Sequence, residues 1–200
     1  MPKVGLWLLF AAAAVAQKKP ITLETLRDAA RIRDVPGAAH WALDGKTFAF
    51  LQGKILQLYL PAARTSRLIV SLDALDAAAI KPADDGPMEW TNRRARTGGL
   101  EWSADGKFLL YSGNGDLFLI RVETGTWDQL TKTAEAEIDP VLSPDGKTVA
   151  FRRGSDLYTL DIATRKETRL TSTGTPTLLN GGLDWVYPEE IGLSLSLIHI

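Results

Sequence analysis

One short turn motif occurs three times along the chain and limits what the chain can fold into. The tripeptide Asp-Gly-Lys begins at Asp44, Asp105 and Asp145, so the copies are 61 and 40 residues apart. Each copy lies in a segment of the same pattern: HWALDGKTFAF, EWSADGKFLLY or VLSPDGKTVAF. Repetition at about 40 residues is typical of folds built from stacked copies of one supersecondary unit.

The third copy explains the composition of the turn. Ser143 can hydrogen-bond the turn backbone, Pro144 presets φ, and Gly146 can take the left-handed conformation that a branched residue resists. After the turn, Val149 and Phe151 alternate with smaller residues, which is the period of a strand. Each copy therefore predicts a strand, a tight turn, a strand, a hairpin and a third strand.

A fourth strand is expected after each third one, as in residues 126–130 and 167–170. Four strands repeated at this period predict an all-β fold, a β-propeller of four-stranded antiparallel blades. Because closed propellers typically have 4–8 blades, the three copies predict an incomplete ring over residues 38–191. The longer first spacing places an insertion at residues 73–97, whose polar and proline-bearing composition predicts a surface excursion.

The first 16 residues have the pattern of a secretory signal peptide. Lys3 precedes an apolar run over residues 4–15, which closes in the A-x-A site Ala14-Val15-Ala16. The run is short for a membrane span of about 20 residues, although an uncleaved anchor or a buried helix stays an alternative. Residues 17–37 are expected to form an N-terminal segment with one short helix.

Two adjacent carboxylates follow the repeats in the segment GGLDWVYPEEI, residues 181–191. Pro188 suits a first helical position, which puts Glu189 and Glu190 in the first turn, where negative charge is favoured. Burial of two like charges is costly unless a cation neutralises them. The pair therefore predicts either a site for a cationic group or a solvated acidic loop.

The wording DWVYPEE resembles the DWVY-x-EE signature of the dipeptidyl peptidase IV family, in the prolyl oligopeptidase clan. The resemblance implies that Glu189 and Glu190 bind the free α-amino group of a peptide substrate. The scaffold of the motif is matched by four residues: Asp184, Trp185, Val186 and Tyr187. It also implies an eight-bladed propeller, a following α/β-hydrolase domain absent from this chain, and a full-length protein that can form a homodimer.

Other chemistry is missing from the sequence. No Gly-x-Ser-x-Gly elbow occurs, so we expect no catalytic residue in this chain, which should be inactive alone. The sequence has no metal-ligand cluster and no phosphate-binding glycine loop, which predicts no metal and no cofactor. A net charge of −1 argues against nucleic-acid binding, and the absence of cysteine excludes disulfides. His40 reads as structural and the cluster at Arg93, Arg94 and Arg96 as a solvated loop.

Residues 192–200 depart from the family pattern, and LSLIHI is what CTG TCT CTT ATA CAC ATC encodes. That string matches a transposon-end adaptor, which predicts a non-native tail, with a genuine apolar strand as the alternative. Two functions stay open. The first is the propeller part of an exported serine dipeptidyl peptidase, which the acidic motif favours. The second is a TolB-like periplasmic propeller that binds proteins without catalysis, because the repeats also resemble TolB-type blades.

Overall fold

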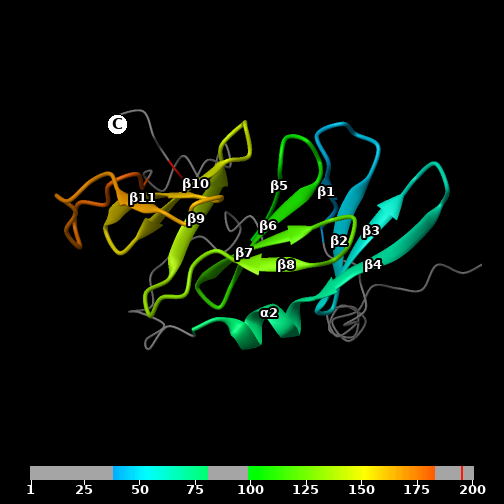
Figure 1. Cartoon of the computed structure of the whole chain (residues 1–200), viewed down its shortest axis with the longest axis horizontal. Coiled ribbons are helices and arrows are strands. Elements are labelled where there is room, and N and C mark those ends of the chain that lie inside the picture. The colour runs from blue at the N-terminus through cyan, green and yellow to red at the C-terminus, as the bar shows by residue number, and fades with distance from the viewer. Residues whose placement is uncertain (1–37, 81–98, 183–194, 196–200) are drawn as a thin grey trace, which may run out of the picture. The chain divides into compact units, whose positions relative to one another are not determined.

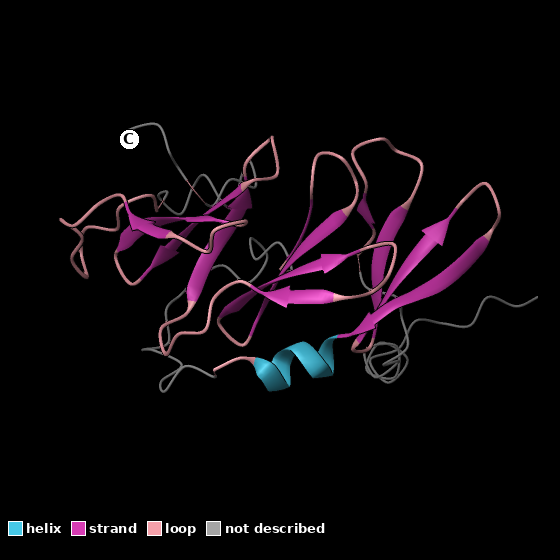
Figure 2. Ribbon diagram, in the orientation of Figure 1, coloured by secondary structure: helices cyan, strands magenta, loops and turns pink. Residues whose placement is uncertain are grey.

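The computed structural model describes residues 38–80, 99–182 and 195. Their strands form three four-stranded antiparallel sheets, each in chain order (Figures 1 and 2). The first sheet contains β1 (His40–Trp41), β2 (Phe48–Gln52), β3 (Ile55–Leu60) and β4 (Thr65–Ser71). The second contains β5 (Leu100–Trp102), β6 (Phe108–Gly113), β7 (Asp116–Arg121) and β8 (Trp127–Gln129). The third contains β9 (Glu137–Leu142), β10 (Thr148–Arg153), β11 (Asp156–Asp161) and β12 (Glu167–Arg169).

The Asp-Gly-Lys turns join the first and second strands of each sheet, at equivalent places, as predicted. Gly45, Gly106 and Gly146 have φ of +67°, +69° and +69°, the left-handed region that favours glycine. Their amides donate to the carbonyl oxygen three residues earlier at 2.9, 2.9 and 2.8 Å. The repeated tripeptide is therefore a conformational requirement of the turn.

The serine of the turn makes the predicted backbone contact. The Ser143 hydroxyl accepts a hydrogen bond from the Thr148 amide at 3.0 Å and donates to Asp145 Oδ1 at 2.6 Å. The hydroxyl of Ser143 and the Lys147 amide together lower the pKa of the Asp145 carboxyl. These contacts span five residues or fewer, so the turn can form from local sequence alone.

The next hairpin of the second sheet also forms as predicted, with Gly113-Asn114-Gly115 as its turn. Gly113 pairs with Asp116, which leaves Asn114 and Gly115 as the two loop residues. Their φ values are +48° and +94°. Positive φ at both positions favours the twist of an antiparallel hairpin, which explains the choice of Asn and Gly.

The insertion after the first sheet differs from its prediction at its beginning. We expected a polar surface excursion over residues 73–97, but Leu72–Ala78 forms helix α2. Leu72 and Leu75 lie one turn apart and are buried in the core between the first and second sheets. Two leucines on one helix face outweigh the polar composition of the segment. Residues 81–98, including the arginine cluster, lie outside the described residues.

Two apolar cores hold neighbouring sheets together face to face. The first core joins the first and second sheets, and the second core joins the second and third sheets. Phe118 and Phe151 are fully buried at their centres. Complete burial of one such side chain stabilises the fold by about 1.5–3 kcal/mol. Each sheet thus depends on its neighbour to remove one face from water.

A fully buried aspartate ties the second sheet to the segments on either side of it. Asp116, the first residue of β7, is 0% exposed. Its carboxylate accepts hydrogen bonds from the amide of Ile80 at 2.7 Å, from Gln129 Nε2 at 3.1 Å and from the amide of Thr133 at 2.9 Å. Ile80 follows α2, and Thr133 leads into the third sheet. One carboxylate therefore fixes the entry to the second sheet and the exit from it.

We predict that Asp116→Ala lowers the free energy of unfolding by about 3 kcal/mol or more, because each buried donor left without an acceptor costs about 1–3 kcal/mol. Urea denaturation followed by circular dichroism measures this loss. The matched control is Asp128→Ala, which removes a half-exposed ion pair with Arg121 at 2.8 Å. The control should cost less than about 1 kcal/mol. Equal losses for the two variants would contradict the role of Asp116.

Candidate functional site

The predicted acidic pair Glu189 and Glu190 lies outside the described residues, as do the motif residues 184–187. The N-terminal segment of residues 1–37 and the tail residues 192–194 and 196–200 lie outside them too. The structure does describe the third sheet and the connection that leads from β12 to Gly182, two residues before the motif begins. This connection is the described base of the candidate site.

Asp156, the first residue of β11, holds the connection to the third sheet. It occupies the place in the third sheet that Asp116 occupies in the second, and it is 5% exposed. Its Oδ1 accepts hydrogen bonds from Thr171 Oγ1 at 2.9 Å, the Gly174 amide at 3.0 Å and Asn180 Nδ2 at 2.9 Å. The carboxylate thus binds the connection near its start and near its end.

The other carboxylate oxygen of Asp156 pairs with the guanidinium of Arg169 on β12. This ion pair, followed by the hydrogen bond from Asn180, lowers the pKa of the Asp156 carboxyl well below its usual range. The carboxylate therefore stays ionised through the whole physiological range of pH. Its four partners need the ionised form, because a protonated carboxyl loses acceptor capacity.

A β-bulge in the innermost strand places an ion pair beside Gly182. Asp139 has a φ of +51°, and the register between β9 and β10 shifts between Ala150 and Arg152. Arg152 donates to Asp139 Oδ2 from Nη2 at 2.6 Å and from Nε at 3.2 Å. A Cβ on Gly182 would lie 3.3 Å from Arg152 Nη1, so only glycine passes this arginine without displacing it. Bulges of this kind occur beside binding sites, where they redirect a side chain.

A second arginine binds the inner and outer strands of the same sheet together. Arg153 contacts Glu137 of β9 and Glu167 of β12, each at 2.7 Å. Its guanidinium also lies 5.3 Å from the ring centre of Phe151 and 5.0 Å from that of Tyr158. Both carboxylates and both rings restrain Arg153, which makes this end of the third sheet a rigid support.

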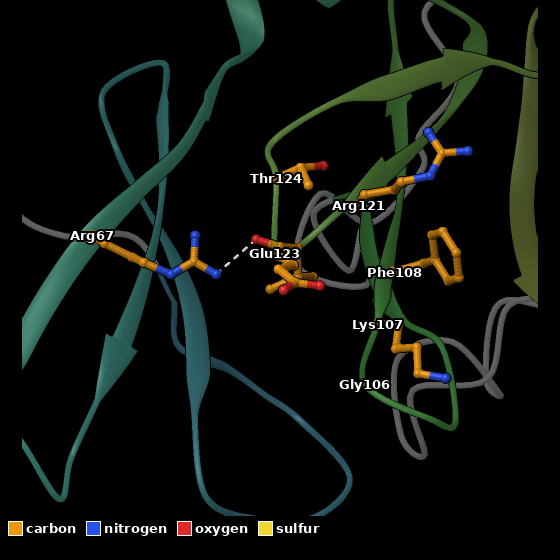
Figure 3. A pocket seen from close by; sticks show the side chains of 8 residues that line it. Arg67, Gly106, Lys107, Phe108, Arg121, Glu123 and Thr124 are labelled. Atoms are coloured by element: carbon orange, nitrogen blue, oxygen red, sulfur yellow. Dashed lines mark hydrogen bonds between the residues drawn. The ribbon is translucent and has the colours of Figure 1, made fainter.

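A basic hollow of about 290 Å³ opens between the first and second sheets (Figure 3). Arg67 points into it and donates to the Val122 carbonyl oxygen at 2.7 Å. Arg121 and Lys107 also line it, but each has an acidic partner, Asp128 at 2.8 Å and Asp105 at 3.3 Å. The hollow adjoins an Asp-Gly-Lys turn, whereas the connection to Gly182 leaves from the opposite ends of the strands. It is separate from the candidate site.

Sequence reasoning missed Asp156, Asp139 and Arg152. The Asp139-Pro140 pair was an available signal, since proline inside a strand marks an edge or a bulge. Within residues 38–80 and 99–182, no three His, Asp or Glu side chains gather so as to hold a metal ion. The part of the chain that the structure describes contains no helix long and apolar enough to cross a membrane.

We predict that Asp156 makes the stability of the fold depend on acid. Because its pKa is lowered on folding, its contribution is fully present above the unfolded value of about 3.9 and is lost as pH falls through the folded value. Asp156→Asn should therefore reduce stability at pH 7 and flatten its decline below about pH 5. Urea titrations between pH 7 and pH 2 measure both effects. Parallel curves for the two proteins would contradict this assignment.

Comparison with known proteins gives three findings. Residues 103–196 match the family model described as "Dipeptidyl peptidase IV (DPP IV) N-terminal region". Dipeptidyl peptidase 4 of Trichophyton tonsurans is 37% identical over 75 residues, which are 37% of this chain and 9% of that protein. The Tol-Pal system protein TolB of Francisella tularensis is 25% identical over 129 residues, which are 59% of this chain and 28% of that protein.

The solved structures show the fold. The crystal structure of Porphyromonas gingivalis dipeptidyl peptidase 4 superposes with a TM-score of 0.57 at 19% sequence identity. The superposition covers 89% of this chain and 26% of that chain. This chain therefore spans about a quarter of that structure and less than a tenth of the curated fungal peptidase. The matched residues and the fold place it in the dipeptidyl peptidase IV family, as a portion of the N-terminal propeller region.

Proposed function

We propose that this chain is the propeller part of an exported serine dipeptidyl peptidase, which releases dipeptides from the N-termini of peptides. The observation that carries the proposal is the pair Glu189-Glu190 in DWVYPEE, inside the matched range 103–196. An α-ammonium is largely protonated at neutral pH and still more so beside two carboxylates. The pair is the kind of site that selects peptides with a free N-terminus.

In this proposal the acidic pair binds and positions, and it makes or breaks no bond. By holding the substrate ammonium, it sets the second peptide bond at a serine of an α/β-hydrolase domain in the longer protein. A pair that measures distance needs a fixed origin. The connection held by Asp156 and the glycine that passes Arg152 support such an origin on the third sheet.

Export and the second candidate function complete the proposal. The signal-like residues 1–16 would direct the protein to the periplasm or the medium. A TolB-like propeller that binds proteins is favoured by the 25% identity to TolB over 129 residues. The coding DNA downstream of residue 191 decides between the two. A Gly-x-Ser-x-Gly elbow followed by Asp and His supports the peptidase, and further blades followed by a stop codon support the binding module.

We predict that Glu189→Gln and Glu190→Gln, each made in the longer protein, lower kcat/KM on dipeptidyl substrates at least about tenfold. Loss of one partner of a desolvated charge pair costs about 2–5 kcal/mol, and about 1.4 kcal/mol corresponds to one factor of ten. The thermal midpoint should barely change, because each substitution relieves repulsion in the unliganded site. Steady-state kinetics and thermal melts measure the two effects.

Two controls separate binding of the ammonium from general damage. Substrates with an acetylated N-terminus should be poor for the wild type and no worse for either variant, since they have no ammonium to lose. Glu123→Gln changes an exposed carboxylate on the opposite rim and should keep wild-type kcat/KM. If both Glu variants keep wild-type kcat/KM on free-amine substrates, the acidic pair has no part in binding.

We also predict that the chain of 200 residues has no peptidase activity by itself, because its sequence contains no Gly-x-Ser-x-Gly nucleophile elbow. The purified chain, incubated with a dipeptidyl chromogenic substrate, should release product at the rate of the buffer blank. A rate above the blank that survives repeated purification and disappears on Glu189→Gln would show that the chain carries its own nucleophile.

A further inference from the structure

The first sheet carries an aromatic face that points away from the second sheet. We define the aromatic face by five residues: Trp41, Phe48, Phe50, Tyr59 and Leu68. Phe48 lies at its centre, with ring centres 4.9 Å from Trp41 and 5.0 Å from Tyr59. The alternating residues Ala49 and Leu58 point the other way, into the core shared with the second sheet. The face is therefore a second apolar surface of the same sheet.

The aromatic face has the same register as the faces by which the other two sheets pack backward. Phe48 pairs with Tyr59 four residues after its Asp-Gly-Lys aspartate. At that place Leu109 pairs with Ile120 in the second sheet, and Val149 pairs with Leu160 in the third. Each of these pairs belongs to the core shared with the preceding sheet. The repeat thus assigns the aromatic face to a preceding sheet as well.

Exposure distinguishes the first sheet from the other two. Leu109, Ile120 and Val149 are each 0% exposed under their preceding sheets. On the aromatic face, Trp41 is 52% and Leu68 is 60% exposed. Large apolar side chains that gather in one exposed patch mark an interaction surface rather than ordinary surface variation.

We propose that the aromatic face is the docking surface for a further four-stranded blade of this repeat, carried by the same polypeptide in its longer form. This inference rests on the fold and not on the proposed function. The P. gingivalis structure contains about four times as much chain as this one covers. Propellers typically have 4–8 blades, so a longer chain of this fold can return a blade to the first one.

The second sheet shows what such a blade presents. Its side toward the third sheet carries Leu110, Leu117 and Leu119, which pack on Val149 and Phe151. The occupant of the aromatic face should therefore offer an aliphatic surface of branched side chains. An aliphatic surface over a cluster of rings buries a large apolar area without any polar partner.

A second copy of this chain fits the aromatic face poorly. It would have to offer the far side of its third sheet, where Ala150, Leu157 and Thr159 replace the three leucines. Leu157 is already fully buried, and Thr159 is polar. The third sheet of another copy therefore lacks the aliphatic surface that the second sheet has.

The test adds one blade to the full chain. A second copy of residues 99–138 is inserted directly before Ala38, which reproduces the 40-residue spacing between the second and third turns. Because the chain has no cysteine, Leu68→Cys supplies a single thiol on the aromatic face. Alkylation of this thiol should be at least about tenfold slower in the extended chain than in the original one, since reaction requires access to the sulfur.

Two controls make the result specific. Thr124→Cys, placed only in the original second blade, should react at the same rate in both chains. Leu110→Ser, Leu117→Ser and Leu119→Ser, placed together in the added blade, should restore fast alkylation at residue 68. Trp41→Ala should lower the thermal midpoint of the extended chain more than that of the original one.

Three results would overturn the proposal. The first is equal alkylation of the Leu68→Cys thiol with and without the added blade. The second is protection that survives the triple serine substitution, which would show that an unspecific cover is enough. The third is protection in the original chain that grows with protein concentration, because the occupant would then be a second copy.

Discussion

A buried carboxylate at the start of the third strand of a blade holds this structure together. Asp116 and Asp156 occupy equivalent places, and each collects hydrogen bonds from segments that enter or leave its sheet. Backbone amides at such crossings have no strand partner, and burial makes an unpaired donor costly. One ionised side chain satisfies several of them at once. The order of the sheets along the chain therefore depends on two aspartates as well as on apolar packing.

The same two aspartates connect stability with the candidate site. Asp116 fixes the passage from the second sheet to the third, and Asp156 fixes the passage from the third sheet to Gly182. The repeat thus uses one device for blade order and for the origin of the acidic segment. A site that measures the distance from an ammonium to a peptide bond needs this rigidity, because misplacement by about 1 Å can cost a hundredfold in rate.

Apolar packing in this fold is pairwise, since each sheet covers only one face of its neighbour. Stacked repeats share this property, and their terminal units differ from the internal ones. The first sheet follows the rule with its aromatic face, while the third sheet departs from it with Ala150, Thr159 and the Arg152–Asp139 pair. The two outer sheets are therefore chemically different surfaces, one apolar and one polar.

The sequence alone determined the features that depend on contacts within a few residues. The left-handed glycines, the serine-capped turns and the alternation of strands all follow from local sterics and hydrogen bonds, so the three blades were predictable. The acidic motif was also visible, because its residues are adjacent in the chain. Tertiary structure alone decided which polar groups meet across long separations, as Ile80 meets Asp116, and that the helix of the insertion enters the core. Composition cannot reveal such contacts, because burial of a side chain depends on what the rest of the chain places over it.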